Sequence, residues 1–277
     1  TAGTTAVIEF STSNVTSDML IGADAGAGNY DLDDTELAQI QAADVIRFGT
    51  TDGAASGTMT FRTATSPLSS EEIEINSSGT ITLDDEGSAI ALATGGTGTI
   101  DINLNFGSGG TLTVTNGDNT FADLSTTNLI DIDGTNGDIG SEANPVQFPT
   151  ADNRLQITTT GGNIFIAGLG SFEPDDISTV DGSIDIEADV NGSKLTIPSS
   201  GGGAGIRATG NGNITLSSAD DMFIEKFVQT ANGDIFIDAD SDDDGGGELE
   251  TTGSGDVSST GGGTIDVTLA EVKFVGD

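Results

Sequence analysis

The residues whose spacing most clearly suggests chemistry form an acidic run late in the chain. Asp240, Asp242 and Asp244 alternate with other residues and are followed by Gly245, which is the spacing of the carboxylate ligands in a calcium-binding loop. An EF-hand is rejected, because its twelfth position is Thr251 rather than a bidentate Glu and no flanking helices are readable. Two interpretations stay open: a looser calcium site formed by Asp240, Asp242 and Asp244 at a turn, or a solvated acidic turn without an ion.

Composition rules out several other kinds of site. The 277 residues include no His and no Cys, which excludes Ser-His-Asp and Cys-His triads, His or Cys metal sites, and disulfides. Asp and Glu number 45 against 7 Lys and Arg, so the net charge is −38. Such a field repels phosphate, so we expect no nucleic-acid partner. No run approaches the roughly 20 apolar residues of a membrane span.

A carbohydrate-active enzyme is the alternative function from another class. Its site would need paired carboxylates in a groove, a basic side chain to neutralise an acidic sugar, and aromatic rings to stack on sugar rings. Carboxylate pairs abound here, but the seven basic residues are scattered, Trp is absent and the sole Tyr is Tyr30. We therefore expect no catalytic residues and a protein that is not an enzyme.

The elements that would position these side chains are short strands behind turn glycines. A Gly-x-apolar-x-apolar pattern begins at Gly79, Gly98, Gly110, Gly162, Gly182, Gly212, Gly233 and Gly263. Spacings such as that from Gly162 to Gly182 indicate a regular repeat. Short strands at this period predict an all-β fold, a parallel β-helix (a β-solenoid) with coils of about 20 residues. The alternative, a β-sandwich array, would need antiparallel hairpins with tight Asn-Gly or Asp-Gly loops.

Alternation within these strands predicts which side chains face the core. We expect the glycines to allow positive φ at sharp corners. Phe165 and Phe236 occupy the middle of Gly-x-Ile-Phe-Ile strands, so both should point outward. Inward positions are assigned to Ile81, Ile100, Ile164, Ile184, Ile214, Ile235 and Ile265.

One segment has a different period. Leu37, Ile40 and Ala43 recur at helical spacing after Asp33 and Asp34, either of which could cap a helix. We expect a short helical insertion near 34–43. Residues 1–30 are loosely patterned entry coils, and 31–277 form one continuous, elongated β-helix region. The strand-like run at 271–275 and the absence of a leader pattern suggest a segment of a longer secreted chain.

Several stretches resemble filamentous-haemagglutinin-like giant secreted or surface proteins. The stretch Asp34–Gly49 looks like their acidic-Leu … Ile-x-Ala … Gly unit, and Asn136–Val146 resembles their G-x-I-G-x-x-A-N-P corner. Gly233–Asp240 and Gly263–Val272 are similar to their repeats. The resemblance implies a right-handed parallel β-helix rod in a bacterial surface protein, with roles in adhesion or extracellular scaffolding.

The function that we expect is therefore an extracellular structural or adhesive rod at a bacterial cell surface. Its partners would be an extracellular surface, a carbohydrate or matrix ligand, or copies of itself in a fibre. A third hypothesis is a calcium-dependent assembly module, in which calcium is the only cofactor. Strong negative charge would keep such a rod soluble, and salt would screen its self-repulsion.

Overall fold

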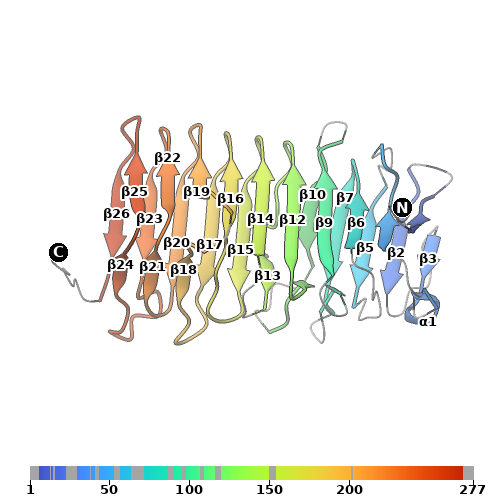
Figure 1. The fold of residues 1–277 in the computed structure, drawn as a ribbon, viewed down its shortest axis with the longest axis horizontal. Helices are drawn as coiled ribbons and strands as arrows, with labels where there is room; N and C mark the ends of the chain where they lie inside the picture. Colours follow the sequence, from blue (N-terminus) through green and yellow to red (C-terminus); the bar gives the residue numbers. More distant parts are fainter. Residues whose placement is uncertain are drawn as a thin grey trace, which may run out of the picture. The chain divides into compact units, whose positions relative to one another are not determined.

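The computed structural model describes residues 6–12, 14, 16–22, 30–37, 39–40, 44–52, 57–63, 72–86, 90–94, 98–106, 109–115, 120–149, 154–200 and 202–270. The chain divides into two compact units, Thr1–Val146 and Gln147–Asp277. Both consist almost entirely of β-strands, and neighbouring strands in their sheets run parallel (Figure 1). The all-β class with parallel pairing is confirmed. The predicted division at residue 30 stays a prediction.

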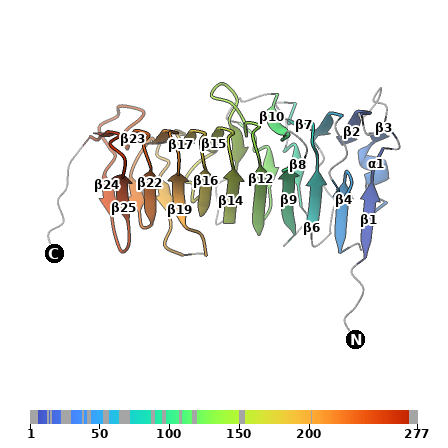
Figure 2. The ribbon, with the colours of Figure 1, turned by 90° about the horizontal axis from the view of Figure 1, so that it is seen from above.

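The first unit contains three parallel sheets. In Figure 2 the strands of its first and second sheets lie in separate rows. The first sheet has the order β1 (Val7–Phe10), β4 (Val45–Phe48), β6 (Glu72–Asn76), β9 (Thr99–Leu104) and β12 (Leu129–Gly134). The second has the order β10 (Thr111–Val114), β7 (Thr80–Asp84), β5 (Met59–Arg62), β2 (Met19–Gly22) and β3 (Tyr30–Leu32), and the third pairs β11 (Leu124–Ser125) with β8 (Leu92–Ala93).

The second unit repeats this plan more regularly. Its first sheet contains β14 (Arg154–Thr159), β16 (Asp176–Thr179), β19 (Gly205–Ala208), β22 (Phe227–Thr230) and β25 (Asp256–Ser259). Its second contains β13 (Val146–Phe148), β15 (Ile164–Gly168), β17 (Ile184–Ala188), β20 (Ile214–Ser218), β23 (Ile235–Asp238) and β26 (Ile265–Thr268). Its third contains β18 (Leu195–Ile197), β21 (Met222–Ile224) and β24 (Leu249–Thr251). From β16 onward the chain visits the three sheets in strict rotation.

The repeat is longer and less even than the sequence pattern predicted. In the first sheet of the second unit, Ile157 pairs with Ile177, and Ile177 pairs with Ile206. The number of residues between register partners is therefore clearly larger for the second pair than for the first. In the first unit, the step from Ile46 to its partner Ile73 is also longer than predicted. The expectation of even coils was wrong because loops of different length separate the strands. Gly79 precedes β7 and Gly98 precedes β9, and these strands belong to different sheets. The spacing between the two glycines is therefore not the repeat length of one sheet.

The single helix among the described residues, α1, spans Asp34–Leu37. Asp33 is its cap: the Asp33 carboxylate accepts the Glu36 backbone N–H at 2.8 Å, and the Glu36 carboxylate accepts the Asp33 N–H at 3.2 Å. This reciprocal pair satisfies two backbone donors that a helix start leaves without partners. The predicted helical insertion is therefore present over Asp34–Leu37, and residues 38 and 41–43 of the predicted span lie outside the described residues.

Stacked isoleucines form the interior of each unit. Six of the seven predicted inward isoleucines, from Ile81 to Ile235, are at most 1% exposed. Ile265 is the exception at 45% exposed. It lies on β26, the last strand of its sheet among the described residues, where Ile235 covers one side and no described strand covers the other. The assignment of Ile265 to the core was wrong for this reason.

The motif glycines are required by close packing of backbones rather than by positive φ. A Cβ built on Gly212 would lie 1.6 Å from the carbonyl oxygen of Gly182, and one on Gly182 would lie 2.0 Å from that of Gly162. Gly233 and Gly263 are crowded in the same way by the preceding glycine of the column. Each glycine therefore leaves room for the strand stacked against it. We call Gly162, Gly182, Gly212, Gly233 and Gly263 the glycine column.

The residue after each of these glycines continues a polar ladder through the second unit. The Asn163 side chain accepts the Ser183 backbone N–H at 2.9 Å, and the Ser183 hydroxyl accepts the Asn213 N–H at 3.1 Å. Asn213 then accepts the Asp234 N–H at 2.9 Å, and Asp234 accepts the Thr264 N–H at 2.7 Å. Backbone donors at the starts of successive strands are thereby satisfied without water. We call this series the Asn163–Thr264 ladder.

A buried ion pair connects strands that are not direct neighbours. Lys226, just before β22, donates to Asp175, just before β16, at 2.9 Å, although β19 lies between these strands. Gly203 and Gly205, at the start of the intervening strand, carry no side chains to obstruct the contact. A Cβ on Gly203 would lie 2.6 Å from the Asp175 carbonyl oxygen. Lys226 and Asp175 are both at least nine-tenths buried. Loss of either residue would therefore leave the other as a buried charge without its partner.

Candidate functional site

The predicted calcium residues do come together. Asp240, Asp242 and Asp244 lie in the loop between β23 and β24, and each offers a carboxylate oxygen within 4.8 Å of the others. Two oxygens bound to one calcium ion at about 2.3–2.6 Å are at most about 5 Å apart. Asp240 is 9% exposed, whereas Asp242 and Asp244 are exposed. The three oxygens therefore fit one divalent cation from its protein side.

The same carboxylates also hold the loop through its own backbone. Asp240 accepts the Gly245 N–H at 3.3 Å, and Asp244 accepts the Gly246 N–H at 2.8 Å. Asp243 adopts a left-handed φ of 55°, which turns the chain between the ligands. A solvated acidic turn with internal hydrogen bonds is thus compatible with this geometry, as is a cation site. Thr251, the twelfth position of the rejected EF-hand, lies on β24.

Sequence reasoning missed two residues that adjoin this loop. Asp220 accepts the Gly247 N–H at 3.4 Å, and Asp221 accepts the Glu248 N–H at 3.1 Å. Asp221 also pairs closely with the Lys194 ammonium. The local density of acidic residues was visible in the sequence, but these contacts between distant parts of the chain were not. Asp234, a nearby acidic residue of the sequence, belongs to the Asn163–Thr264 ladder and not to this loop.

A second acidic group, which sequence reasoning did not single out, crosses the outer face of the first unit. Glu74, Asp101 and Asp131 are register partners on β6, β9 and β12. Arg47, on β4, neutralises only Glu74 in this row, at 2.7 Å. Burial, and then the charges of Asp131, Glu72, Glu74 and Asp133, raise the pKa of Asp101 to about 7. We call Glu74, Asp101 and Asp131 the acidic row.

Two arginines of the first unit form ion pairs with its acidic side chains. Arg62 contacts Asp84 at 3.0 Å and Glu86 at 3.3 Å in the first unit. Arg47 reaches Glu9 at 3.3 Å as well as Glu74. Each of these two arginines therefore contacts two carboxylates.

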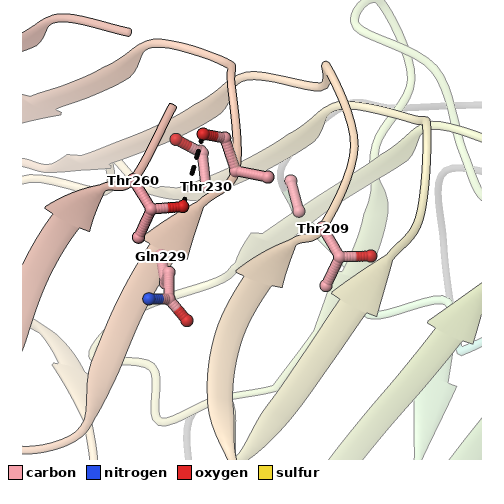
Figure 3. A pocket seen from close by; sticks show the side chains of 6 residues that line it. Thr209, Gln229, Thr230 and Thr260 are labelled. Carbon is pink, nitrogen blue, oxygen red and sulfur yellow. Dashed lines mark hydrogen bonds between the residues drawn. The ribbon is translucent and has the colours of Figure 1, made fainter. Parts of the chain in front are cut away.

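Two hollows lie on the surface of the second unit. Figure 3 shows the smaller, about 120 Å³, where the side chains of Thr209, Gln229, Thr230 and Thr260 gather and the Thr260 hydroxyl donates to a backbone oxygen. Its lining contains no ionisable group. The larger, about 260 Å³, contains Asp238 and Asp266 but no basic residue. Neither hollow combines the converging carboxylates and basic side chain that the enzyme hypothesis requires.

Comparisons with protein-family models, with curated proteins and with solved structures found no match. Over the described residues, no helix is both long and apolar enough to cross a membrane.

Proposed function

We propose that each unit is a right-handed parallel β-helix and that the chain is a segment of an extracellular structural or adhesive rod. The observation that carries the proposal is the repeated stacking of parallel strands in the second unit. There, strands visit three parallel sheets in rotation, isoleucines stack on isoleucines, and the Asn163–Thr264 ladder joins each strand of the second sheet to the next. In repeat proteins each unit is stabilised by its neighbours, so such stacking supplies a stiff spacer.

The proposed setting follows from charge and from the resemblance to filamentous-haemagglutinin-like surface proteins. A net charge of −38 opposes lateral aggregation and keeps an exposed rod in solution. The partners that suit it are a carbohydrate or matrix ligand, or copies of itself in a fibre. Retention of the chain on immobilised carbohydrates, matrix proteins or its own copies separates an adhesive role from that of a plain spacer.

The coiled path is tested with cysteine pairs, since the native chain has no Cys. We expect disulfides in Thr158→Cys/Ser178→Cys, Asp185→Cys/Thr215→Cys and Thr196→Cys/Phe223→Cys, which are register partners in the first, second and third sheets. Neighbouring strands lie about 4.8 Å apart, within the Cα separation of about 4.4–6.8 Å that a disulfide spans. Intact mass and thiol titration measure their formation.

The matched control is Ser178→Cys/Gln229→Cys. Arg207 lies between these two outward positions in the register, so their separation is about twice the strand spacing, or about 9.6 Å. It should not cross-link. A disulfide in this control, or failure of all three register pairs, would contradict the coiled path.

We propose a calcium-dependent assembly module as a second candidate, because Asp240, Asp242 and Asp244 converge. Salt should raise the melting temperature by screening carboxylate repulsion. Millimolar CaCl₂ should raise it further than NaCl of matched ionic strength, since a ligand bound only by the folded state stabilises that state. Asp242→Asn/Asp244→Asn should remove the calcium-specific increment and keep the salt effect. An equal calcium response in both proteins would leave this loop as a solvated turn.

A further inference from the structure

Several phenylalanines of the second unit have their rings on the outer surface, and two of them, Phe223 and Phe227, carry a cation of the chain itself. The Lys194 ammonium lies 5.9 Å from the centre of the Phe223 ring, and the Arg207 guanidinium lies 5.5 Å from that of Phe227. Cations at this distance are attracted by the negative face of an aromatic ring. A chain with seven basic residues thus places two of them on outward rings.

Carboxylates complete one of these arrangements. Lys194 contacts Asp221 closely and lies 3.8 Å from Asp220. Hydrogen bonding and attraction from Asp221, then Asp220, raise the pKa of Lys194 and favour its charged form. The chain therefore provides its own example of a cation held between an aromatic face and two acidic side chains.

Phe236 also lies beside two acidic residues, and among the described residues no cation is placed on its ring. It is 38% exposed on β23 and lies in the larger hollow, of about 260 Å³. Asp266 is its register partner on β26, and Asp238 is two residues further along β23. Hydroxyls of Thr215, Ser217 and Thr268 also line the hollow, and its lining includes no basic residue. We call this hollow the Phe236 groove.

We propose that the Phe236 groove binds an arginine side chain presented by a basic polypeptide partner. The two carboxylates supply the complementary charge, and the ring supplies a flat surface on which a guanidinium stacks. Five N–H donors of the guanidinium match the carboxylate and hydroxyl acceptors around the ring better than the compact ammonium of lysine does. The proposal extends beyond the rod role and does not depend on it, because it needs only the outer face of three strands.

General attraction to a chain of charge −38 has to be separated from binding at this groove. The probe is an acetylated and amidated peptide of four Gly-Arg repeats, titrated at 0.15 M NaCl and followed by calorimetry and by the NMR signals of the Phe236 ring. Phe236→Leu keeps the net charge, so only the aromatic contact changes. We expect it to weaken binding about two- to fivefold. Phe227→Leu is the control, because the native Phe227 ring already carries Arg207. This variant should bind the peptide as tightly as the native chain does.

The carboxylates are tested with a charge-matched pair of variants. Asp238→Asn/Asp266→Asn should weaken peptide binding about tenfold, because charged hydrogen-bond acceptors are lost at the site. Asp242→Asn/Asp244→Asn removes the same charge from another exposed loop and should have little effect. Equal affinity of the native chain and Phe236→Leu, with unchanged melting temperatures, would overturn the proposal. A neutral oligosaccharide that shifts the Phe236 signals where the arginine peptide does not would also overturn it.

Discussion

Replacement of Gly212 by alanine should lower the free energy of unfolding by roughly 3–5 kcal/mol, a cost at the upper end for single substitutions. The new Cβ would lie 1.6 Å from the Gly182 carbonyl oxygen and 2.4 Å from its carbon. Both are backbone atoms of the preceding glycine of the column, so no side-chain rotation can relieve the overlap. The strands must separate, and thermal unfolding should show a fall in melting temperature of about 10 °C.

Gly202→Ala is the matched control. Gly202 is exposed, has ordinary φ, and a Cβ there would meet nothing within 4 Å. Its substitution should change the free energy of unfolding by about 0.5 kcal/mol or less. If Gly212→Ala and Gly202→Ala have the same melting temperature, close stacking of the glycine column is not what holds the strands in place.

Raising the pH from about 4 to about 7 should destabilise the first unit through Asp101. Its pKa is raised from 3.8 to about 7 in the folded state, so in this window the folded chain retains a proton that the unfolded chain releases. Stability is therefore highest below the unfolded pKa, and it falls as pH rises toward 7. Full conversion of the shift would give about 4 kcal/mol, but Asp101 is only half-buried, and solvent screening reduces the expected loss to about 1–2 kcal/mol.

Asp101→Asn isolates this contribution. The amide has nearly the same shape and still offers an oxygen to Asn103, which donates to Asp101 at 2.9 Å. The variant should match the native chain at pH 4 and unfold at higher denaturant concentration at pH 8. Asp256→Asn, at an exposed position of β25, removes the same charge elsewhere. If Asp256→Asn reduces the pH dependence of stability as much as Asp101→Asn does, net charge and not the acidic row accounts for that dependence.

The strand pattern was the most predictable property of this chain. Alternation around Ile164 and Ile235 placed both side chains inside and the intervening Phe165 and Phe236 outside. The structure agrees, with both isoleucines fully buried and Phe236 38% exposed. Side-chain period is a local property of a strand, so short segments of sequence determine it.

Register and loop length were less predictable, because they depend on residues far apart in the chain. Ile177 pairs with Ile206 in parallel register although 28 residues lie between them in the chain, and the loop residues among these carry no periodic signal. Ile265 has the same local pattern as Ile235, and only its position on the last described strand of the sheet exposes it.

The candidate sites divide in the same way. Convergence of Asp240, Asp242 and Asp244 followed from their spacing within one loop. The acidic row did not, because Glu74, Asp101 and Asp131 lie on three strands that are far apart in the sequence and meet only through register. The signal that could have found it is the recurrence of an acidic residue between two isoleucines at those three places.

The Asn163–Thr264 ladder has a direction that bears on how the chain is made. In every step the acceptor side chain belongs to the earlier strand and the donated N–H to the later one. Synthesis proceeds from the amino terminus. Each acceptor side chain is therefore already present when the next strand of the second sheet is made. Each partner belongs to the strand stacked immediately before it, so folding of the second unit can keep pace with synthesis and need not wait for distant sequence.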